Sequence, residues 1–248
     1  MTAALTIDAL EVDFGGFKAV DGMTTVINQG ELRVVLGPNG AGKTTLMDLI
    51  SGKTASTGGE VRLFGRDITN RPEHRIARAG VGRKFQIPSV FRDLTVHDNL
   101  RVAVSHEPRV FRNLRIGMAA RDSARIDEVI ALTGLEPVLD VVAGDLSHGQ
   151  MQWLELGMLI TQQARVILLD EPTAGMTQSE TLKTADIILR LKGSHTLLVV
   201  EHDMAFVRKI AERVTVMHMG RLLAEGTMER IEQDPAVREA YLGSGGLH

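Results

Sequence analysis

One eight-residue stretch carries three glycines, a lysine and a threonine in the order G-x-x-x-x-G-K-T. Its residues are Gly37, Pro38, Asn39, Gly40, Ala41, Gly42, Lys43 and Thr44, and Thr45 follows. Glycines permit backbone conformations that a Cβ excludes, so several N–H groups can point toward one anion. A lysine in this position reaches the β- and γ-phosphates of a nucleotide, and the threonine hydroxyl binds Mg²⁺. The pattern therefore predicts a loop that binds a nucleoside triphosphate.

The segments on either side of this loop distinguish a phosphate-binding loop from an ordinary glycine-rich turn. Residues 32–36 form a short apolar run, and residues 45–50 place apolar side chains at helical spacing. Phosphate binding requires this order of strand, loop and helix, because the helix amino terminus adds the positive end of its dipole. The flanking segments favour phosphate binding over a simple turn.

Two carboxylates, Asp170 and Glu171, directly follow an apolar run at residues 166–169. Ligands of parallel sheets bind beyond the carboxyl ends of the strands, so both side chains are expected to face the nucleotide. Asp170 could position Mg²⁺, and Glu171 could polarise the attacking water as a general base. Pro172 is also consistent with a plain turn after the strand, but the phosphate loop upstream favours a chemical role.

The polar segment at residues 147–150 has two interpretations. Ser147 followed by Gln150 three residues later is a helix-capping pattern. A polar helix amino terminus is also a site for an anion. Because residues 37–44 already supply one phosphate loop, a second phosphate-directed helix end would be surplus in a monomer, which suggests a dimer.

Composition sets the broad class of the protein. The chain has 248 residues, a formal net charge of −3 and no cysteine. This length can bury a full core, and the charge provides no basic field that would recruit nucleic acid. Disulfides and thiolate metal sites are excluded, and the histidines show no metal-ligand spacing. No secretory signal or membrane-spanning stretch is visible, so we expect a membrane role to act through a partner.

Short apolar segments alternate with helical patterns, which predicts an α/β fold with a parallel sheet. Between about residues 94 and 159 the strand signals give way to helical periodicity. This change predicts a helical lobe inserted into the α/β core. Strands are expected at residues 5–13, 23–27, 32–36, 60–64, 166–169, 197–200 and 214–217, and helices at residues 45–50, 179–191 and after Asp203.

In the order and type of its motifs, the chain resembles the ATP-binding subunits of ABC transporters over essentially its whole length. The matching features are the Walker A motif at residues 37–44, the Q-loop glutamine Gln86, the signature motif at residues 146–150, the Walker B acid Asp170 with the catalytic glutamate Glu171, and the switch histidine His202. The resemblance implies a P-loop NTPase fold, with a RecA-like core sheet, an antiparallel β subdomain and an inserted helical subdomain. It implies a core at residues 1–86 and 161–248 and a helical subdomain at residues 87–160, which together form one ABC domain.

The resemblance also implies a role for each site residue. Lys43, Glu171 and His202 are expected in catalysis. Thr44, Gln86 and Asp170 are expected to hold or sense Mg²⁺. Phe14 is similar to the aromatic residue that stacks on adenine, and together with residues 37–45 it is expected to bind ATP. Ser147, His148, Gly149 and Gln150 are expected to bind the ATP of a second subunit.

These roles imply an assembly in which two ATPase subunits sandwich two ATP molecules. The expected partners are a second ATPase subunit, two transmembrane permease subunits and, indirectly, a solute-binding protein, with no nucleic acid. The chain is expected at the cytoplasmic face of the inner (plasma) membrane. Residues 87–91 are expected to help form the groove that contacts the permease.

Within the family, the chain is most similar to the importers of branched-chain amino acids and urea. The run from Arg83 to Gln86 and the ending at residues 239–243 carry this similarity. Residues 152–155 and 174–177 favour urea, with branched-chain amino acids as the alternative. Thr177 stands where most relatives have Asp, which puts equal activity of two sites in question. We therefore expect a heterodimer with a different ATPase subunit, and a homodimer is the alternative.

His148 occupies a signature position where glycine is commoner. Its ring could pack locally or face solvent, or it could reach the partner's ATP and make hydrolysis pH-sensitive.

Two other classes of protein are alternatives for the whole chain. A non-transport ABC protein would be expected to have two cassettes, a coiled-coil insertion or a basic surface, and a GTPase would carry an Asn-Lys-x-Asp motif; the sequence has none of these.

Overall fold

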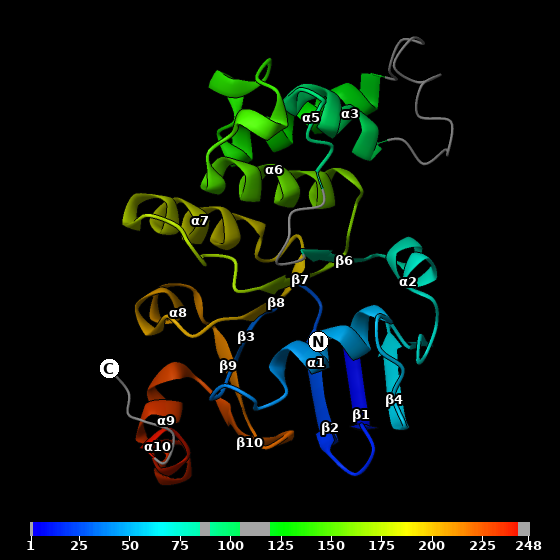
Figure 1. The fold of residues 1–248 in the computed structure, drawn as a ribbon, viewed down its shortest axis with the longest axis vertical. Coiled ribbons are helices and arrows are strands. Elements are labelled where there is room, and N and C mark those ends of the chain that lie inside the picture. The colour runs from blue at the N-terminus through cyan, green and yellow to red at the C-terminus, as the bar shows by residue number, and fades with distance from the viewer. Residues whose placement is uncertain (1, 85–89, 105–119, 243–248) are drawn as a thin grey trace. The chain divides into compact units, whose positions relative to one another are not determined.

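The computed structural model describes residues 2–84, 90–104 and 120–242 (Figure 1). These residues divide into two compact units. The core unit comprises Met1–Arg83, Arg165–Glu171 and Leu191–His248, and the helical unit comprises Lys84–Ala164 and Pro172–Arg190. The segment boundaries expected from the sequence, at residues 86–87 and 160–161, stay a prediction.

A six-stranded sheet in the order β10-β9-β3-β8-β7-β6 forms the centre of the core unit. β3 runs parallel to both β8 and β9, and β7 runs parallel to β8. Every residue of β3, β7 and β8 is buried, which agrees with continuous apolar runs packed on both faces. The strands are β3 (Leu32–Leu36), β6 (Val81–Lys84), β7 (Val166–Asp170), β8 (Thr196–Val200), β9 (Arg213–His218) and β10 (Arg221–Gly226).

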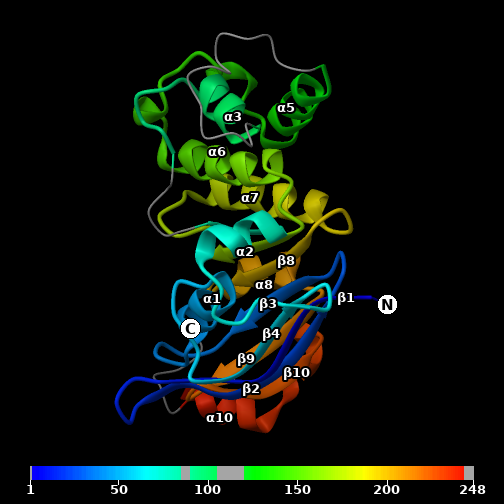
Figure 2. The same cartoon turned by 90° about the vertical axis from the view of Figure 1, so that its right-hand side faces the viewer.

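A second, antiparallel sheet has the order β2-β1-β4-β5, and Figure 2 labels its strands β1, β2 and β4. Its strands are β1 (Ala3–Asp13), β2 (Lys18–Asn28), β4 (Gly58–Leu63) and β5 (Arg66–Asp67). One apolar cluster joins this sheet to the parallel sheet and to α1, with Ile7, Leu46 and Leu168 among its buried members. The predicted combination of a parallel core sheet with an antiparallel subdomain is confirmed.

Helices complete both units. The core unit has α1 (Lys43–Ser51), α2 (Glu73–Ala79), α8 (Met204–Ile210), α9 (Met228–Gln233) and α10 (Pro235–Leu242). The helical unit has α3 (Val96–Val104), α5 (Ala120–Thr133), α6 (His148–Thr161), nearly all of α7 (Gln178–Leu191) and two 3₁₀ turns (Glu136–Val138 and Ala143–Asp145). The described part of the predicted lobe is thus helical. None of the helices described reaches the length and apolar character that crossing a bilayer requires.

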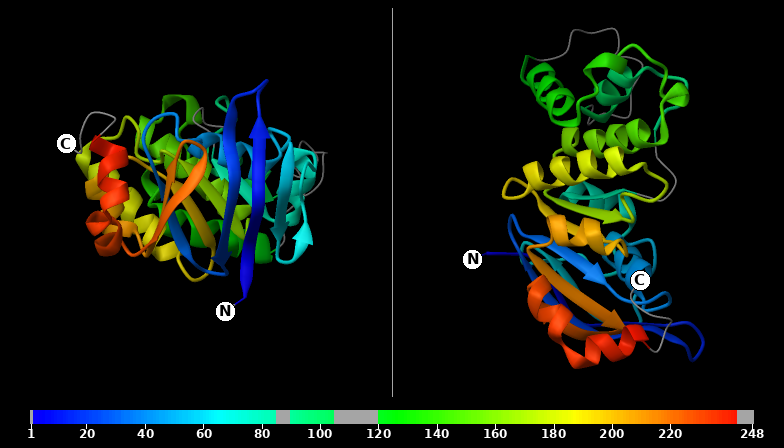
Figure 3. Two further views of the ribbon diagram at one scale, coloured as in Figure 1. Left: turned by 90° about the horizontal axis from the view of Figure 1, so that it is seen from below. Right: turned by 90° about the vertical axis from the view of Figure 1, so that its left-hand side faces the viewer.

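The sequence patterns did not predict β10, α9 or α10. β10 pairs antiparallel with β9 at the edge of the parallel sheet, α9 packs on both of these strands, and α10 packs on β10 (Figure 3). β10 has no fully buried residue, so it lacks the apolar run by which the central strands were recognised.

A fully buried arginine, Arg33, ties the two sheets together. Its guanidinium donates to Glu225 Oε2 at 2.6 Å, to Thr215 Oγ1 at 2.9 Å and to Glu31 Oε1 at 2.7 Å. It also donates to the Val26 carbonyl in the antiparallel sheet at 3.1 Å. A buried cation is tolerated only when its donors are satisfied in this way.

We predict that Arg33→Met lowers the free energy of unfolding by about 3–5 kcal/mol, because it leaves the carboxylates of Glu31 and Glu225 without their buried partner. Urea denaturation followed by circular dichroism measures this loss. The matched control is Arg62→Met, which breaks an exposed pair with Glu60 and should hardly move the urea midpoint. Equal losses in the two variants would contradict a special role for the buried pair.

Candidate functional site

The residues predicted to do chemistry gather at one edge of the parallel sheet. The loop at residues 37–44 follows β3, Asp170 ends β7 and Glu171 follows it, and His202 follows β8 after one residue. β8 pairs in parallel with both β3 and β7, so the carboxyl ends of the three strands are neighbours. The structure therefore brings the loop, the two acids and the histidine together within the core unit.

The backbone of the phosphate loop requires glycine at both ends. φ is +152° at Gly37 and +98° at Gly42, a region that other residues rarely adopt. A Cβ at Gly37 would clash with the carbonyl oxygen of Met217, and one at Gly42 with that of Ala19. The loop is thus seated against β9 and β2 with no room for side chains at these two positions.

Lys43 begins α1 and lies buried beside the two acids. Its ammonium group donates to the carbonyl oxygens of Gly37 at 2.7 Å and Pro38 at 3.0 Å. Burial lowers its pKa, and the charges of Glu171 and Asp170 oppose that shift. An ammonium group has three donors, so one remains for a further acceptor, such as a phosphate oxygen.

Asp170 is buried at the end of β7, and burial raises its pKa. The guanidinium of Arg83 lies 3.7 Å from its Oδ2, and this charge and the Thr44 hydroxyl act in the opposite direction. Its other oxygen, Oδ1, has no hydrogen-bond partner among the described residues. A buried carboxylate oxygen without a partner is costly, which makes it a ready acceptor for a cation or a water.

Glu171 and His202 face each other across the ends of β7 and β8. His202 Nδ1 lies 3.4 Å from Glu171 Oε1, and the backbone N–H of Glu171 donates to the Val200 carbonyl at 2.9 Å. Glu171 has a φ of +45°, which is unusual for a residue with a side chain and is typical of strained functional positions. Both side chains remain partly exposed, so a water could reach the carboxylate.

Sequence reasoning missed Glu201, which positions the loop of the histidine. Its side chain is buried, and its carboxylate accepts hydrogen bonds from the backbone N–H groups of His202 at 3.0 Å and Asp203 at 3.4 Å. Asp203 in turn caps α8. The acid next to His202 was visible in the sequence, but only the burial separates its role from that of an exposed acid.

Phe14 lies in the tight turn between β1 and β2, where its backbone N–H donates to the Phe17 carbonyl at 2.9 Å. Both phenylalanines are more than half exposed. The expected role of Phe14 in stacking on adenine stays a prediction, and Phe17 offers a second exposed ring on the same turn. Gln86 and residues 87–89 lie outside the described residues.

The predicted signature segment opens α6 in the helical unit. Ser147 is the N-cap, its hydroxyl accepts the Gln150 N–H at 3.2 Å, and the Gln150 side chain accepts the Ser147 N–H at 2.9 Å. The capping interpretation is therefore confirmed.

Glu180 of α7 links this helix start to residue 177. Its carboxylate accepts hydrogen bonds from the backbone N–H and hydroxyl of Thr177 at 2.9 and 2.8 Å, and it lies 3.4 Å from the Ser147 hydroxyl. A Cβ at Gly149 would crowd the same carboxylate, which would have to shift. Thr177, at the position where most relatives have Asp, donates to Glu180.

The ring of His148 packs within the helical unit. Its Nε2 lies 3.0 Å from the Ala174 carbonyl and 3.3 Å from Gln152 Nε2. Of the two readings of His148, this geometry supports local packing. The ring links the signature segment to Ala174, three residues before Thr177, which donates to Glu180.

The carboxyl-terminal helix also approaches the phosphate loop, which sequence patterns did not predict. A cavity of about 600 Å³ is lined on one side by residues 38–41 and on the other by Ala236, Glu239 and Ala240 of α10. Burial raises the pKa of Tyr241 in α10, and a hydrogen bond from the Gly37 backbone opposes that shift. α10 is therefore part of the surroundings of the loop.

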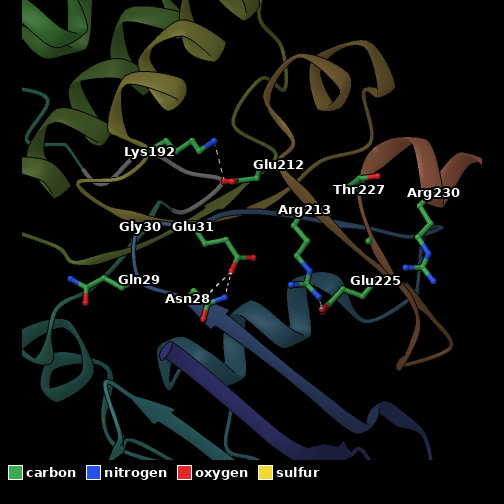
Figure 4. Close-up of a pocket in the computed structure, with 11 residues that line it drawn as sticks. Asn28, Gln29, Gly30, Glu31, Lys192, Glu212, Arg213, Glu225, Thr227 and Arg230 are labelled. Carbon is green, nitrogen blue, oxygen red and sulfur yellow. Dashed lines mark hydrogen bonds and ion pairs between the residues drawn. The ribbon is translucent and has the colours of Figure 1, made fainter. Parts of the chain in front are cut away.

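A different cavity, of about 500 Å³, lies at the opposite edge of the parallel sheet (Figure 4). It is lined by residues that precede β3, β8 and β9, including Glu31 and Lys192, together with Arg213 at the start of β9. Its charges are largely paired, with Lys192 3.1 Å from Glu212 and Arg213 2.8 Å from Glu225. Because α/β sheets bind their ligands at the carboxyl ends of strands, this cavity is not the nucleotide site.

Comparisons with known proteins agree with this arrangement. The model of the ABC transporter family matches residues 20–174, and a model described as branched-chain amino acid ATP-binding cassette transporter matches residues 221–246. The chain is 36% identical over 96% of its length, and 97% of the relative's, to the high-affinity branched-chain amino acid transport ATP-binding protein BraF of Pseudomonas aeruginosa. The LivG protein of Escherichia coli K12 is 34% identical over the same shares.

Solved structures give the same result. The fold matches that of an ATP-binding cassette of an ABC transporter in its ADP conformation, with a TM-score of 0.85 and 30% identity over 98% of this chain and 100% of that one. A nucleotide-free cassette matches with a TM-score of 0.82 and 30% identity over 97% of this chain and 99% of that one. The predicted P-loop NTPase fold is thus confirmed. The chain belongs to the ATP-binding subunits of ABC transporters, of the branched-chain amino acid importer type, and is an ATPase whose activity is coupled to transport.

Proposed function

We propose that this chain binds and hydrolyses MgATP at the carboxyl edge of its parallel sheet and thereby drives an importer of branched-chain amino acids. The observation that carries the proposal is the convergence of Lys43, Asp170 and Glu171 beside a glycine loop shaped for an anion. Backbone N–H groups of the loop at residues 37–45 would hold the phosphates. Lys43 would turn from the carbonyls of Gly37 and Pro38 to the β- and γ-phosphates. Phe14 would stack on the adenine.

The residues around Asp170 fit a Mg²⁺ ion. Asp170 Oδ1 lacks a partner among the described residues, and the Thr44 hydroxyl lies within hydrogen-bond reach of this carboxylate. No group of three or more acids, histidines or cysteines that could hold a metal occurs within the described part of the chain. Such an ion would therefore take most of its ligands from phosphate and water, as Mg²⁺ prefers. When bound, it would neutralise charge on the β- and γ-phosphates. Gln86 is proposed to join this set.

Glu171 is proposed as the general base that accepts a proton from the attacking water. His202, whose Nδ1 lies 3.4 Å from Glu171 Oε1, would hold that carboxylate and donate toward the γ-phosphate. Glu201 would act only by fixing the backbone of the histidine.

The remaining half of the site is proposed to come from a second ATPase subunit. Ser147, His148, Gly149 and Gln150 would approach the partner's ATP, since the capped start of α6 presents backbone N–H groups. The hydrogen bonds of Glu180 with Thr177 and Ser147 would fix the conformation of this segment. A different ATPase subunit is the proposed partner, and two permeases would place the chain at the cytoplasmic face of the membrane, with a solute-binding protein acting on the permeases.

Branched-chain amino acids are the solute that the comparisons favour, because the relatives reported above carry that name. The preference for urea finds no support among them. One of its two details also has a reason inside the helical unit: Trp153 donates to Thr184 at 2.9 Å and lies under the Lys183 ammonium. Such packing says nothing about a solute that this subunit does not touch.

We predict that Lys43→Ala weakens ATP binding at least about tenfold, since a hydrogen bond to a charged group contributes about 1.5–3 kcal/mol. Isothermal calorimetry with MgATP measures the affinity. The control is Lys53→Ala, which removes an exposed lysine that lies near Asp48. An unchanged affinity in the Lys43 variant would refute the proposed contact with the phosphates.

Glu171→Gln should retain ATP binding and lose hydrolysis by about 10²–10⁴-fold, the range of general-base losses. Phosphate release at saturating MgATP measures the rate, and calorimetry measures the binding. Glu73→Gln, at the exposed start of α2, is the matched control. A Glu171 variant that hydrolyses at the parent rate would remove this residue from the proposed role.

Deletion of the gene should abolish uptake of radiolabelled leucine, and the wild-type chain but not Glu171→Gln should restore it. Parallel assays with labelled urea separate the two solutes. Loss of urea uptake with normal leucine uptake would overturn the proposed solute while leaving the ATPase assignment intact.

A further inference from the structure

A third cavity of the core unit, of about 690 Å³, is lined by an unusual excess of positive charge. It lies among β4, β5, α2 and the start of β7, away from the phosphate loop. Its charged lining consists of Arg66, Arg71, Arg75, Arg165 and Asp67. The chain as a whole is slightly acidic, so this local excess does not follow from composition.

Among the residues that the structure describes, the four guanidinium groups lack carboxylate partners. No described acid lies within 4.0 Å of any of them. Asp67 accepts hydrogen bonds from Thr69 instead, and these bonds lower its pKa, with the charge of Arg71 as a smaller cause. Arginine stays charged at any physiological pH, so four such groups around one cavity repel each other. In the cavity of Figure 4, by contrast, Lys192 is paired with Glu212 and Arg213 with Glu225.

Arg165 is held in place rather than free in solvent. Its guanidinium lies 3.4 Å from the centroid of the Phe64 ring, and a Cβ at Gly80 would touch its aliphatic stem. Phe64 adopts a φ of +47°, a conformation rarely seen for an aromatic residue. The backbone of the β4–β5 turn thus accepts a strained conformation that keeps this ring under the arginine.

We propose that this cavity binds a multiply charged phosphate group, either on a small soluble molecule or on an anionic lipid. Guanidinium forks match the oxygens of phosphate in pairs, and a phosphate group carries more charge per volume than a carboxylate. The cavity is within the size range of small-molecule sites. This site is separate from the nucleotide site, and it does not depend on the proposed function.

Binding of three probes by the wild-type chain, with the nucleotide site filled by saturating MgADP, tests the site. Tripolyphosphate represents a soluble phosphate, phosphatidylcholine vesicles containing phosphatidic acid, a phosphomonoester, represent a lipid, and citrate is a polyanion without phosphate. The double variant Arg71→Gln/Arg75→Gln should weaken binding of tripolyphosphate or of the vesicles at least about tenfold. The matched control is Arg78→Gln, on the same helix but outside the lining.

The proposal is supported if the double variant loses binding while Arg78→Gln keeps it. The probe that binds then identifies the source of the phosphate. Absence of binding for both phosphate probes, equal binding by the double variant, or equal affinity for citrate would overturn it. Arg71 and Arg75 are exposed, so the double variant should keep its thermal unfolding midpoint and its ATPase rate.

Discussion

The parallel pairing of β3, β7 and β8 is the constraint on which the site depends. These strands are buried along their whole length, so their hydrogen-bond register cannot shift without exposing the core. The register places the phosphate loop, the Walker B acids and the histidine loop at one edge. Three segments far apart in the sequence thereby supply a lysine, two carboxylates and an imidazole to one region.

Charge balance at this edge explains why the site can exist before a nucleotide arrives. Lys43 and Arg83 are buried close to Asp170 and offset the cost of burying that carboxylate. Oδ1 of Asp170 has no hydrogen-bond partner among the described residues, so it can accept a new contact. The Lys43 ammonium can exchange its hydrogen bonds with loop carbonyls for bonds to phosphate oxygens. A bound MgATP would bring negative charge for Lys43 and a cation for Asp170, so neither buried charge would lack an opposite charge.

In the helical unit, a single carboxylate organises the start of α6. One carboxylate, Glu180, holds the Ser147 hydroxyl and both donors of Thr177, and His148 reaches the carbonyl of Ala174. Two segments that are separated in sequence thus behave as one piece. The departure at Thr177 is part of this arrangement, since a hydroxyl can donate to Glu180 and an aspartate could not.

The phosphate loop, the acids after β7, the capped start of α6 and the α/β class could all be predicted from the sequence, because each depends on neighbours only a few residues apart. The tertiary structure alone decided which charges are paired. Glu201, Arg33 and the arginines around the third cavity look like surface charges in the sequence, and their roles follow from burial and from partners distant along the chain. β10 and α10 were missed for a related reason: partly exposed elements carry a weak apolar pattern, and their position comes from packing on β9 and beside the phosphate loop.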